Sequence, residues 1–268
     1  MLAGRQFDWG ARTYVMGIVN TSPDSFSGDG LVDADTAISQ GLAMVREGAD
    51  MVDVGGQSTR PGHEPISAVE EIGRTERVVR ELARHAGAPV AIDTYKLEVA
   101  EAAVEAGAVI INDVWGLQRS PAMADLAARR DCALVLMHNQ DGTDYAVDLM
   151  EEIKRVLREG VWTAFAAGVP RERVWIDPGI GFGKTAEHNW EVMRRLHELT
   201  ELGQPILIGT SRKSFIGKLL DLPADDRVEG TAATVAIAIE RGADIVRVHD
   251  VRVMTRVTRV TDRIVRHA

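Results

Sequence analysis

The sequence is poor in cysteine and has no long hydrophobic run, and each absence excludes a class of protein. Cys132 is the only cysteine among 268 residues, so the chain cannot form an internal disulfide. Its place in the apolar stretch CALVLM is typical of a buried thiol rather than a reactive one. No segment reaches the roughly 18 uninterrupted apolar residues of a membrane span, and the N-terminal stretch MLAGRQFDWGARTY has no apolar region with a cleavage site. We therefore expect a cytoplasmic protein with no membrane partner.

Positive charge is also in short supply. The chain has 31 Lys and Arg against 40 Asp and Glu, a formal net charge of -9. This balance excludes a broad basic face for nucleic acid, so no nucleic-acid partner is expected. The 7 histidines show neither H-x₃-H nor Cys/His spacing, which argues against a zinc site. Any anion that the protein binds must therefore meet a local cluster of positive charge.

Short apolar runs rich in valine and isoleucine alternate with longer amphipathic stretches along the chain. The eight runs are YVMGIV, MVDV, PVAID, VIIND, ALVLMH, VWID, PILIG and DIVRVH. None of them alternates apolar and polar residues, which is typical of parallel strands covered on both faces. Eight strand–helix units in a chain of this length predict a closed (β/α)₈ TIM barrel, a single domain over residues 1–268. A doubly wound open sheet is the alternative, although it usually has fewer strands.

Three of the intervening stretches have apolar residues three and four positions apart, as in a helix with one buried face. They span residues 65–86, 151–167 and 251–265. In the first, the expected buried face includes Val69. In the last, it includes Val260 and Ile264.

Polar side chains stand at or near the end of nearly every predicted strand, where the active sites of such barrels form. One of them alone is more typical of a turn or a helix cap. Together they predict a ligand site, because half-buried charges are costly unless they meet partners. Acids and amides follow earlier strands: Asn20, Asp53, Asp93, Asn112 and Asp177. Basic groups follow the last two: Arg212, Lys213, Arg247 and His249.

This distribution of charge favours a particular kind of substrate. Anionic groups in such barrels often sit beside the last two strands, so we expect a phosphorylated substrate whose head group carries N–H donors for the acids. The stretch GIGFGKT invites a phosphate-loop reading, but Pro178 stands where that motif requires its first glycine. The glycines more simply shape the loop after the sixth strand.

Nine segments, in order, resemble the successive motifs of the dihydropteroate synthase family. They are MGIVNTSPDSFS, DVGGQSTRPG, AIDTYK, IINDV, LMH, IDPGIGFGK, IGTSRKSFIG, EGTAATVAIAI and GADIVRVHDV. The resemblance covers nearly the whole chain. It implies a folate-pathway transferase, the target of sulfonamides, that condenses a dihydropterin-methyl diphosphate with p-aminobenzoate. It also implies a Mg²⁺ cofactor and a homodimer.

The resemblance also implies roles for individual residues. Those implied for the pterin diphosphate are Thr59, Asp93, Asn112, Asp177, Lys213, Arg247 and His249, of which Asp93, Lys213, Arg247 and His249 count as catalytic. Those implied for p-aminobenzoate are Phe26, Phe182 and Ser214. Asn20 would contact the magnesium ion, and Asp53 and Arg60 would order loops or assist the product. The stretch from Thr21 to Gly30 would close over the substrates.

In the reaction that the resemblance implies, diphosphate departs before the amine attacks, and no covalent enzyme nucleophile is needed. Gln57 stands where the family usually has glutamate, and NTSPDSF replaces the more usual NVTPDSF. Two rival functions share the pterin-reading half of the site: a pterin-dependent methyltransferase, and a pterin-binding paralogue without activity. The basic endings SRKS and RVHD favour the synthase over both.

Overall fold

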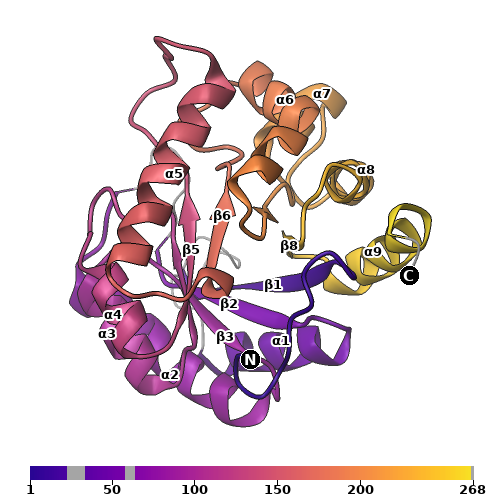
Figure 1. Ribbon diagram of the computed structural model, residues 1–268. Helices are drawn as coiled ribbons and strands as arrows, with labels where there is room; N and C mark the ends of the chain where they lie inside the picture. The colour runs from indigo at the N-terminus through magenta and orange to yellow at the C-terminus, as the bar shows by residue number, and fades with distance from the viewer. Residues whose placement is uncertain (23–33, 58–63, 267–268) are drawn as a thin grey trace.

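The computed structural model describes residues 1–22, 34–57 and 64–266, and its centre is a barrel of eight parallel strands (Figure 1). The strands are β1 Tyr14–Asn20, β2 Met51–Gly55, β3 Val90–Asp93, β4 Ile110–Asp113, β5 Ala133–Met137, β6 Val174–Asp177, β7 Leu207–Ile208 and β8 Ile245–Val248. Their order is β6-β5-β4-β3-β2-β1-β8-β7. A single parallel bridge between Ile176 and Ile206 joins β6 to the start of β7 and closes the ring. The predicted TIM barrel is confirmed, and the open-sheet alternative is wrong.

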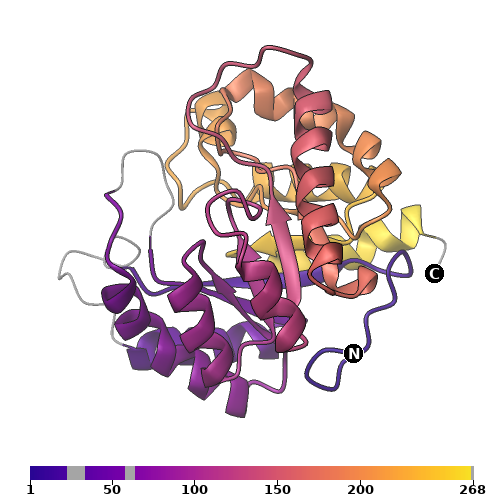
Figure 2. The same ribbon diagram turned by 60° about the vertical axis from the view of Figure 1, so that its left-hand side comes forward.

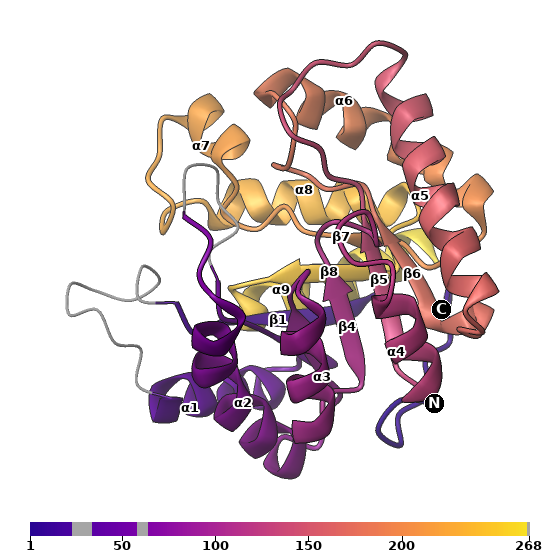
Figure 3. The same cartoon turned by 90° about the vertical axis from the view of Figure 1, so that its left-hand side faces the viewer.

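Helices surround the strands, as Figures 1 and 3 show. They are α1 Ala34–Arg46, α2 Ala68–His85, α3 Leu97–Ala106, α4 Met123–Arg129, α5 Leu149–Ala166, α6 Ala186–Arg195, α7 Ser214–Leu220, α8 Val228–Glu240 and α9 Val251–Val265, with 3₁₀ turns η2 Arg171–Arg173 and η3 Leu196–Leu202. Within the described residues, no helix combines the length and the apolar character needed to cross a bilayer.

The helices bury one face against the sheet, but the predicted faces are partly wrong. In α2 the buried residues include Val78, Val79 and Leu82, whereas Val69 is 81% exposed. In α9 Met254 is buried, but Val260 and Ile264 are 63% and 70% exposed. Spacing alone cannot separate the face that meets the strands from an apolar stripe beside it. In α5 the predicted face is buried, but Trp162 is 66% exposed, so all three helices carry apolar side chains on their outer surface.

The lower half of the barrel interior is apolar. Its inward side chains are Tyr14, Met16, Met51, Ala91, Ile110, Ala133, Val135, Trp175, Leu207 and Ile245, packed as one cluster with Leu2. Phe7 and Trp9 from the N-terminal segment lie against Trp175, with ring centroids 6.0 and 5.2 Å away. This segment closes the end of the barrel toward which the C-terminal end of α9 also points (Figure 2). Among the described residues, this end of the barrel is therefore filled by packed side chains.

The upper half of the interior is polar, and the period of a strand explains why. Residues two apart in a strand point to the same side, so the strands that place Ala91, Ile110 and Trp175 in the lower layer place Asp93, Asn112 and Asp177 above them. Asp113, one residue further along than Asn112, points outward, where it accepts hydrogen bonds from the backbone N–H groups of Trp115 and Leu117. The charged layer thus lies at the carboxyl ends of the strands.

Candidate active site

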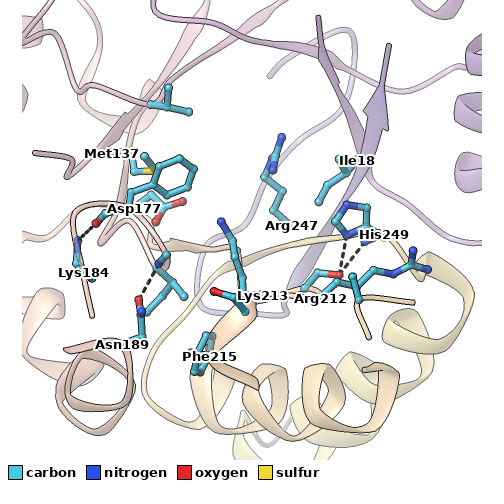
Figure 4. Close-up of a pocket in the computed structure, with 18 of the residues that line it drawn as sticks. Ile18, Met137, Asp177, Lys184, Asn189, Arg212, Lys213, Phe215, Arg247 and His249 are labelled. Atoms are coloured by element: carbon cyan, nitrogen blue, oxygen red, sulfur yellow. Dashed lines mark hydrogen bonds between the residues drawn. The ribbon is translucent and has the colours of Figure 1, made fainter. Parts of the chain in front are cut away.

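The polar layer forms the floor of a cavity of about 650 Å³ at the carboxyl ends of the strands. Figure 4 shows Asp177, Lys213, Arg247 and His249 around it. Ten of the residues selected from the sequence line this cavity: Asn20, Asp93, Asn112, Asp177, Phe182, Arg212, Lys213, Ser214, Arg247 and His249. Phe26, Thr59 and Arg60 lie outside the described residues. The structure therefore gathers at one site all the selected residues that it describes except Asp53.

Asp53 lies beneath the cavity, fully buried, and pairs with Arg247. The Arg247 guanidinium donates through Nε to Asp53 Oδ2 and through Nη2 to Asp93 Oδ2, at 2.6 Å in each case. Asn112 Nδ2 also donates to Asp53 Oδ2, at 2.9 Å. Strands β2, β3, β4 and β8 thus share one network, and Arg247 lies within the group of acids rather than apart from it.

Asp93 has an unused acceptor. Its Oδ1 atom is buried and has no hydrogen-bond partner among the described residues, and burial raises the pKa of Asp93 to about 7 against the opposing pull of Arg247. A buried acceptor without a donor costs free energy, on the order of 1–3 kcal/mol. Asp93 is therefore suited to a ligand that brings N–H donors to the floor of the cavity.

Asp177 is held at the start of the glycine-rich loop after β6. Its Oδ1 accepts a hydrogen bond of 2.7 Å from the Gly179 N–H. Gly179 has φ of +72°, and a Cβ there would lie 1.9 Å from the His138 carbonyl oxygen, so only glycine fits. Burial raises the pKa of Asp177, while the nearby Lys213 and Arg247 lower it. This carboxyl group faces two cations across the cavity.

The surroundings of His249 favour the neutral form of its ring. Burial and the neighbouring Arg212 lower its pKa to about 3. Its Nδ1 lies 3.0 Å from Ser211 Oγ, which also accepts a hydrogen bond from the His249 backbone N–H at 3.1 Å. When the Ser211 hydroxyl donates to Nδ1, Nε2 carries the ring proton and becomes a donor. His249 can therefore offer an N–H to an anion without bringing a full charge.

The two basic residues after β7, Arg212 and Lys213, make different kinds of contact. Arg212 pairs with Asp250 through two hydrogen bonds of 3.1 and 2.6 Å. Lys213 Nζ lies 4.2 Å from the centre of the Phe182 ring, within the range of a cation–π contact. Lys213 therefore connects the charged floor of the cavity to an aromatic ring on its wall.

Gln57, the departure noted in the sequence, also lines the cavity. Its Oε1 accepts from Lys96 Nζ at 2.7 Å and from the Ile66 N–H at 3.1 Å, and the same ammonium pairs with the buried Glu71 at 2.6 Å. A glutamate at position 57, which is half-buried, would place a second carboxylate beside Lys96. The Gln57 amide keeps the hydrogen bonds with Lys96 and Ile66, and the Lys96 ammonium then pairs with one carboxylate, that of Glu71.

The chain offers few ligands for a metal ion. Among the described residues, no group of three or more His, Cys, Asp or Glu side chains is arranged to hold one. Asn20 ends β1, half-buried, on the cavity wall. One amide oxygen suits a hard cation that takes most of its ligands from phosphate oxygens and water.

Lys184 lines the cavity but did not emerge from the sequence as a site residue. It lies beside Asp177 in Figure 4, is 8% exposed, and its Nζ lies 2.8 Å from His138 Nδ1. The signal in the sequence is a lysine that closes a glycine-rich loop after a strand, in a stretch that fails the phosphate-loop motif. His138 was recognised only as the end of the fifth apolar run.

Comparisons with known proteins agree over nearly the whole chain. A family model described as pterin binding enzyme matches residues 16–249. The dihydropteroate synthase of Clostridium beijerinckii is 49% identical over 267 residues, which cover 99% of this chain and 99% of that protein. A crystal structure of dihydropteroate synthase from Clostridium difficile in the presence of pteroic acid superposes with a TM-score of 0.94 and 49% identity, covering 97% of this chain and 100% of that one. The enzyme from Xanthomonas albilineans in complex with 7,8-dihydropteroate gives 0.89 and 38%, covering 98% and 97%.

Proposed function

Since this chain belongs to the dihydropteroate synthase family of pterin binding enzymes, we propose that its two substrates meet in the cavity above the charged layer of the barrel. The family resemblance predicted from the sequence motifs is confirmed. The chain is a transferase that condenses (7,8-dihydropterin-6-yl)methyl diphosphate with p-aminobenzoate, giving 7,8-dihydropteroate and pyrophosphate. We further propose that residues 1–268 act as one domain and that the protein works in the cytoplasm.

The pterin ring would occupy the floor of the cavity. Asp177, Asn112 and Asp93 would receive its N–H groups, and Lys213 would donate to its acceptor atoms. The observation that carries this placement is the buried Asp93 Oδ1, which has no partner within the described residues. A hydrogen-bond donor on the ligand would remove the free-energy cost of leaving this buried acceptor unsatisfied. Asp53 would act from below, by holding Arg247 and Asn112 in place.

The diphosphate would lie toward β8. Arg247 would meet it while Asp53 and Asp93 hold the guanidinium in place, His249 would donate from its ring, and Thr59 would add a contact from outside the described residues. Mg²⁺ would be held by Asn20 together with the diphosphate oxygens, and when bound it supplies positive charge beside the leaving group. The net effect of this positive charge would be to lower the activation free energy for release of pyrophosphate.

p-Aminobenzoate would bind nearer the mouth of the cavity. Phe182 would stack on its ring, with Phe26 as the counterpart from the loop after β1. Arg60 would order a loop or assist the product. The Ser214 hydroxyl would receive the carboxylate. This arrangement directs the arylamine nitrogen toward the methylene carbon that carries the diphosphate.

In the mechanism that follows, the C–O bond to the diphosphate breaks first and leaves a positive charge shared between the methylene group and the ring. Asp93 and Asp177 would stabilise that cation, while Arg247 and His249 would stabilise the departing anion. Neither Ser211 nor Cys132 is needed as a nucleophile. The Ser211 hydroxyl is engaged by His249, and burial raises the pKa of the Cys132 thiol to about 11.

We expect purified protein to form dihydropteroate and pyrophosphate in equal amounts from the two substrates and Mg²⁺. A chelator should reduce the rate by about 100-fold or more, since a bound cation contributes several kcal/mol at a developing anion. Asn20→Ala should raise the Mg²⁺ concentration for half-maximal rate about tenfold, by the loss of one ligand. Product is quantified by chromatography, and pyrophosphate by a coupled assay.

The same assay separates the rival functions. A pterin-dependent methyltransferase would give no dihydropteroate but would move a methyl group from a methylated folate to a corrinoid protein. A paralogue without activity would bind the pterin in calorimetry and give neither product. Either result would overturn the proposed placement of the diphosphate.

We also propose that the protein is a homodimer formed through α8 and α9, which pack side by side (Figure 1). Exposed apolar side chains on these helices support this: Ile237 is 45% exposed, Val260 63% and Ile264 70%. Together they mark a surface that gains free energy when covered.

Light scattering should give twice the chain mass of 29.2 kDa. Val260→Glu with Ile264→Glu should give monomers, because two charges would be buried at the interface. Val69→Glu is the matched control, since Val69 is 81% exposed on α2, and it should leave the dimer intact. A dimer that survives the double change would place the interface elsewhere.

A further inference from the structure

The loop that carries Phe182 is fastened to the neighbouring loop by a buried lysine. Lys184 Nζ lies 2.8 Å from His138 Nδ1, at the end of β5, and donates to the Phe182 carbonyl oxygen at 3.1 Å. Tyr145 adds a hydrogen bond of 2.8 Å from its hydroxyl to the Gly183 carbonyl. The segment after β6 is therefore joined to the segment after β5 at two points, through His138 and through Tyr145, while the bond to the Phe182 carbonyl holds Lys184 within its own loop.

The two backbones approach closely along the same line. A Cβ at Gly183, where φ is +55°, would lie 2.8 Å from the Gln140 carbonyl oxygen, and one at Gly179 would meet the His138 carbonyl. Such an approach leaves no room for side chains between the two segments. The lysine reaches across from one edge of this contact and is 8% exposed.

Lys184 is a costly residue to bury here. Within the described part of the chain no ion pair joins it to a carboxylate, and burial lowers its pKa to about 7, with Asp177 acting in the opposite direction. His138 is held neutral, because burial and Lys184 lower its pKa to about 3, so its Nδ1 can accept from the ammonium. A methionine would fill much of the same volume without that cost. Stability therefore does not explain the lysine.

The bonds of Lys184 lead to the aromatic wall of the cavity. By fixing the Phe182 carbonyl, Lys184 restricts where the Phe182 ring can lie, and that ring is 4.2 Å from Lys213 Nζ. We propose that Lys184 is a positioning residue which, held by His138, sets the Phe182 ring against Lys213 and thereby determines the affinity for the arylamine substrate. This inference rests on the proposed binding of p-aminobenzoate at Phe182.

The test is steady-state kinetics of Lys184→Met. The KM for p-aminobenzoate should rise about tenfold or more, as expected when a charged hydrogen bond that orients a binding group is lost. The kcat and the KM for the pterin diphosphate should stay within about twofold, and the thermal midpoint should equal or exceed that of the unaltered protein. A fall in the midpoint with equal rises in both KM values would show a structural role and overturn the inference.

Two variants of His138 and one variant of a remote lysine, Lys154, serve as further tests. His138→Asn keeps an acceptor near the position of Nδ1 and should retain a near-normal KM, whereas His138→Leu should behave like Lys184→Met. Lys154 is equally buried but pairs with Glu151, Glu198 and Glu201. Lys154→Met should therefore lower the thermal midpoint and leave both KM values unchanged.

Phe182→Ala separates this inference from the function on which it rests. If that change leaves the KM for p-aminobenzoate unaltered, the placement of the arylamine is wrong, and the role of Lys184 falls with it. If Phe182→Ala raises the KM and Lys184→Met does not, the placement holds and only the inference about Lys184 fails.

Discussion

Arg247→Met is expected to abolish turnover and to weaken the fold. The Arg247 side chain is 18% exposed and pairs with Asp53, which is fully buried, and with Asp93. Its removal leaves these carboxylates without their counter-charge, which typically costs about 3–5 kcal/mol. It also removes the cation proposed to receive the leaving diphosphate, so kcat/KM should fall by about 1,000-fold or more. Urea unfolding measures the first effect, and product formation at saturating Mg²⁺ measures the second.

Arg195→Met is the matched control for this change. Arg195 likewise pairs with several acids, namely Asp148, Glu191 and Glu198, but it is 30% exposed and lies at the end of α6. Partly exposed pairs contribute about 1 kcal/mol or less, so this variant should be slightly less stable and fully active. If Arg247→Met remained folded with kcat/KM within tenfold of normal, the assignment of the diphosphate to β8 would be wrong.

Asp177→Asn is expected to reduce the affinity for the pterin by about 100-fold, the upper part of the range for losing a charge-assisted hydrogen bond. Asp177 faces Lys213 and Arg247 and is fixed by the Gly179 N–H. The amide would keep the shape but offer no charge, and its NH₂ group would oppose a ring N–H. Calorimetric titration with pteroic acid measures the change directly.

Asp113→Asn makes the same chemical change at a similar position. Asp113 is also buried at the end of a strand and accepts backbone N–H groups, but it points away from the cavity. Its substitution should leave the affinity for pteroic acid within about twofold. Equal losses in both variants would mean that the measurement reports on the barrel as a whole, and the role of Asp177 would have to be abandoned.

The sequence predicted the barrel and most of the candidate site, for a physical reason. Parallel strands must end at one rim, so polar residues at strand ends converge whatever their distance along the chain. It could not predict that Arg247 lies between Asp53 and Asp93, because that contact spans 194 residues and depends on side-chain direction across the barrel. Val69, Val260 and Ile264 were placed in the core for the same reason: spacing describes a stripe but not what the stripe faces.

Lys184 shows a different limit of the sequence. A glycine-rich segment that fails a known phosphate motif offers no further pattern to interpret, and the acceptor for this lysine is 46 residues away. Only the packing of two loops makes the pair visible. The roles of all the selected residues stay predictions, and for Phe26, Thr59 and Arg60 so does their position, since they lie outside the described residues.

The junction between β6 and β7 should open locally more easily than the junction between β1 and β2. In the described part of the chain, β7 has two residues, and one backbone bond, from the Ile176 N–H to the Pro205 carbonyl, crosses to it from β6. Strands β1 and β2, by contrast, are paired over five positions. Asp177 follows one side of this seam and Lys213 the other, so a heterocycle held by both would span the gap. A substrate that contacts both sides would then link β6 to β7 and reduce local opening of the barrel at this junction.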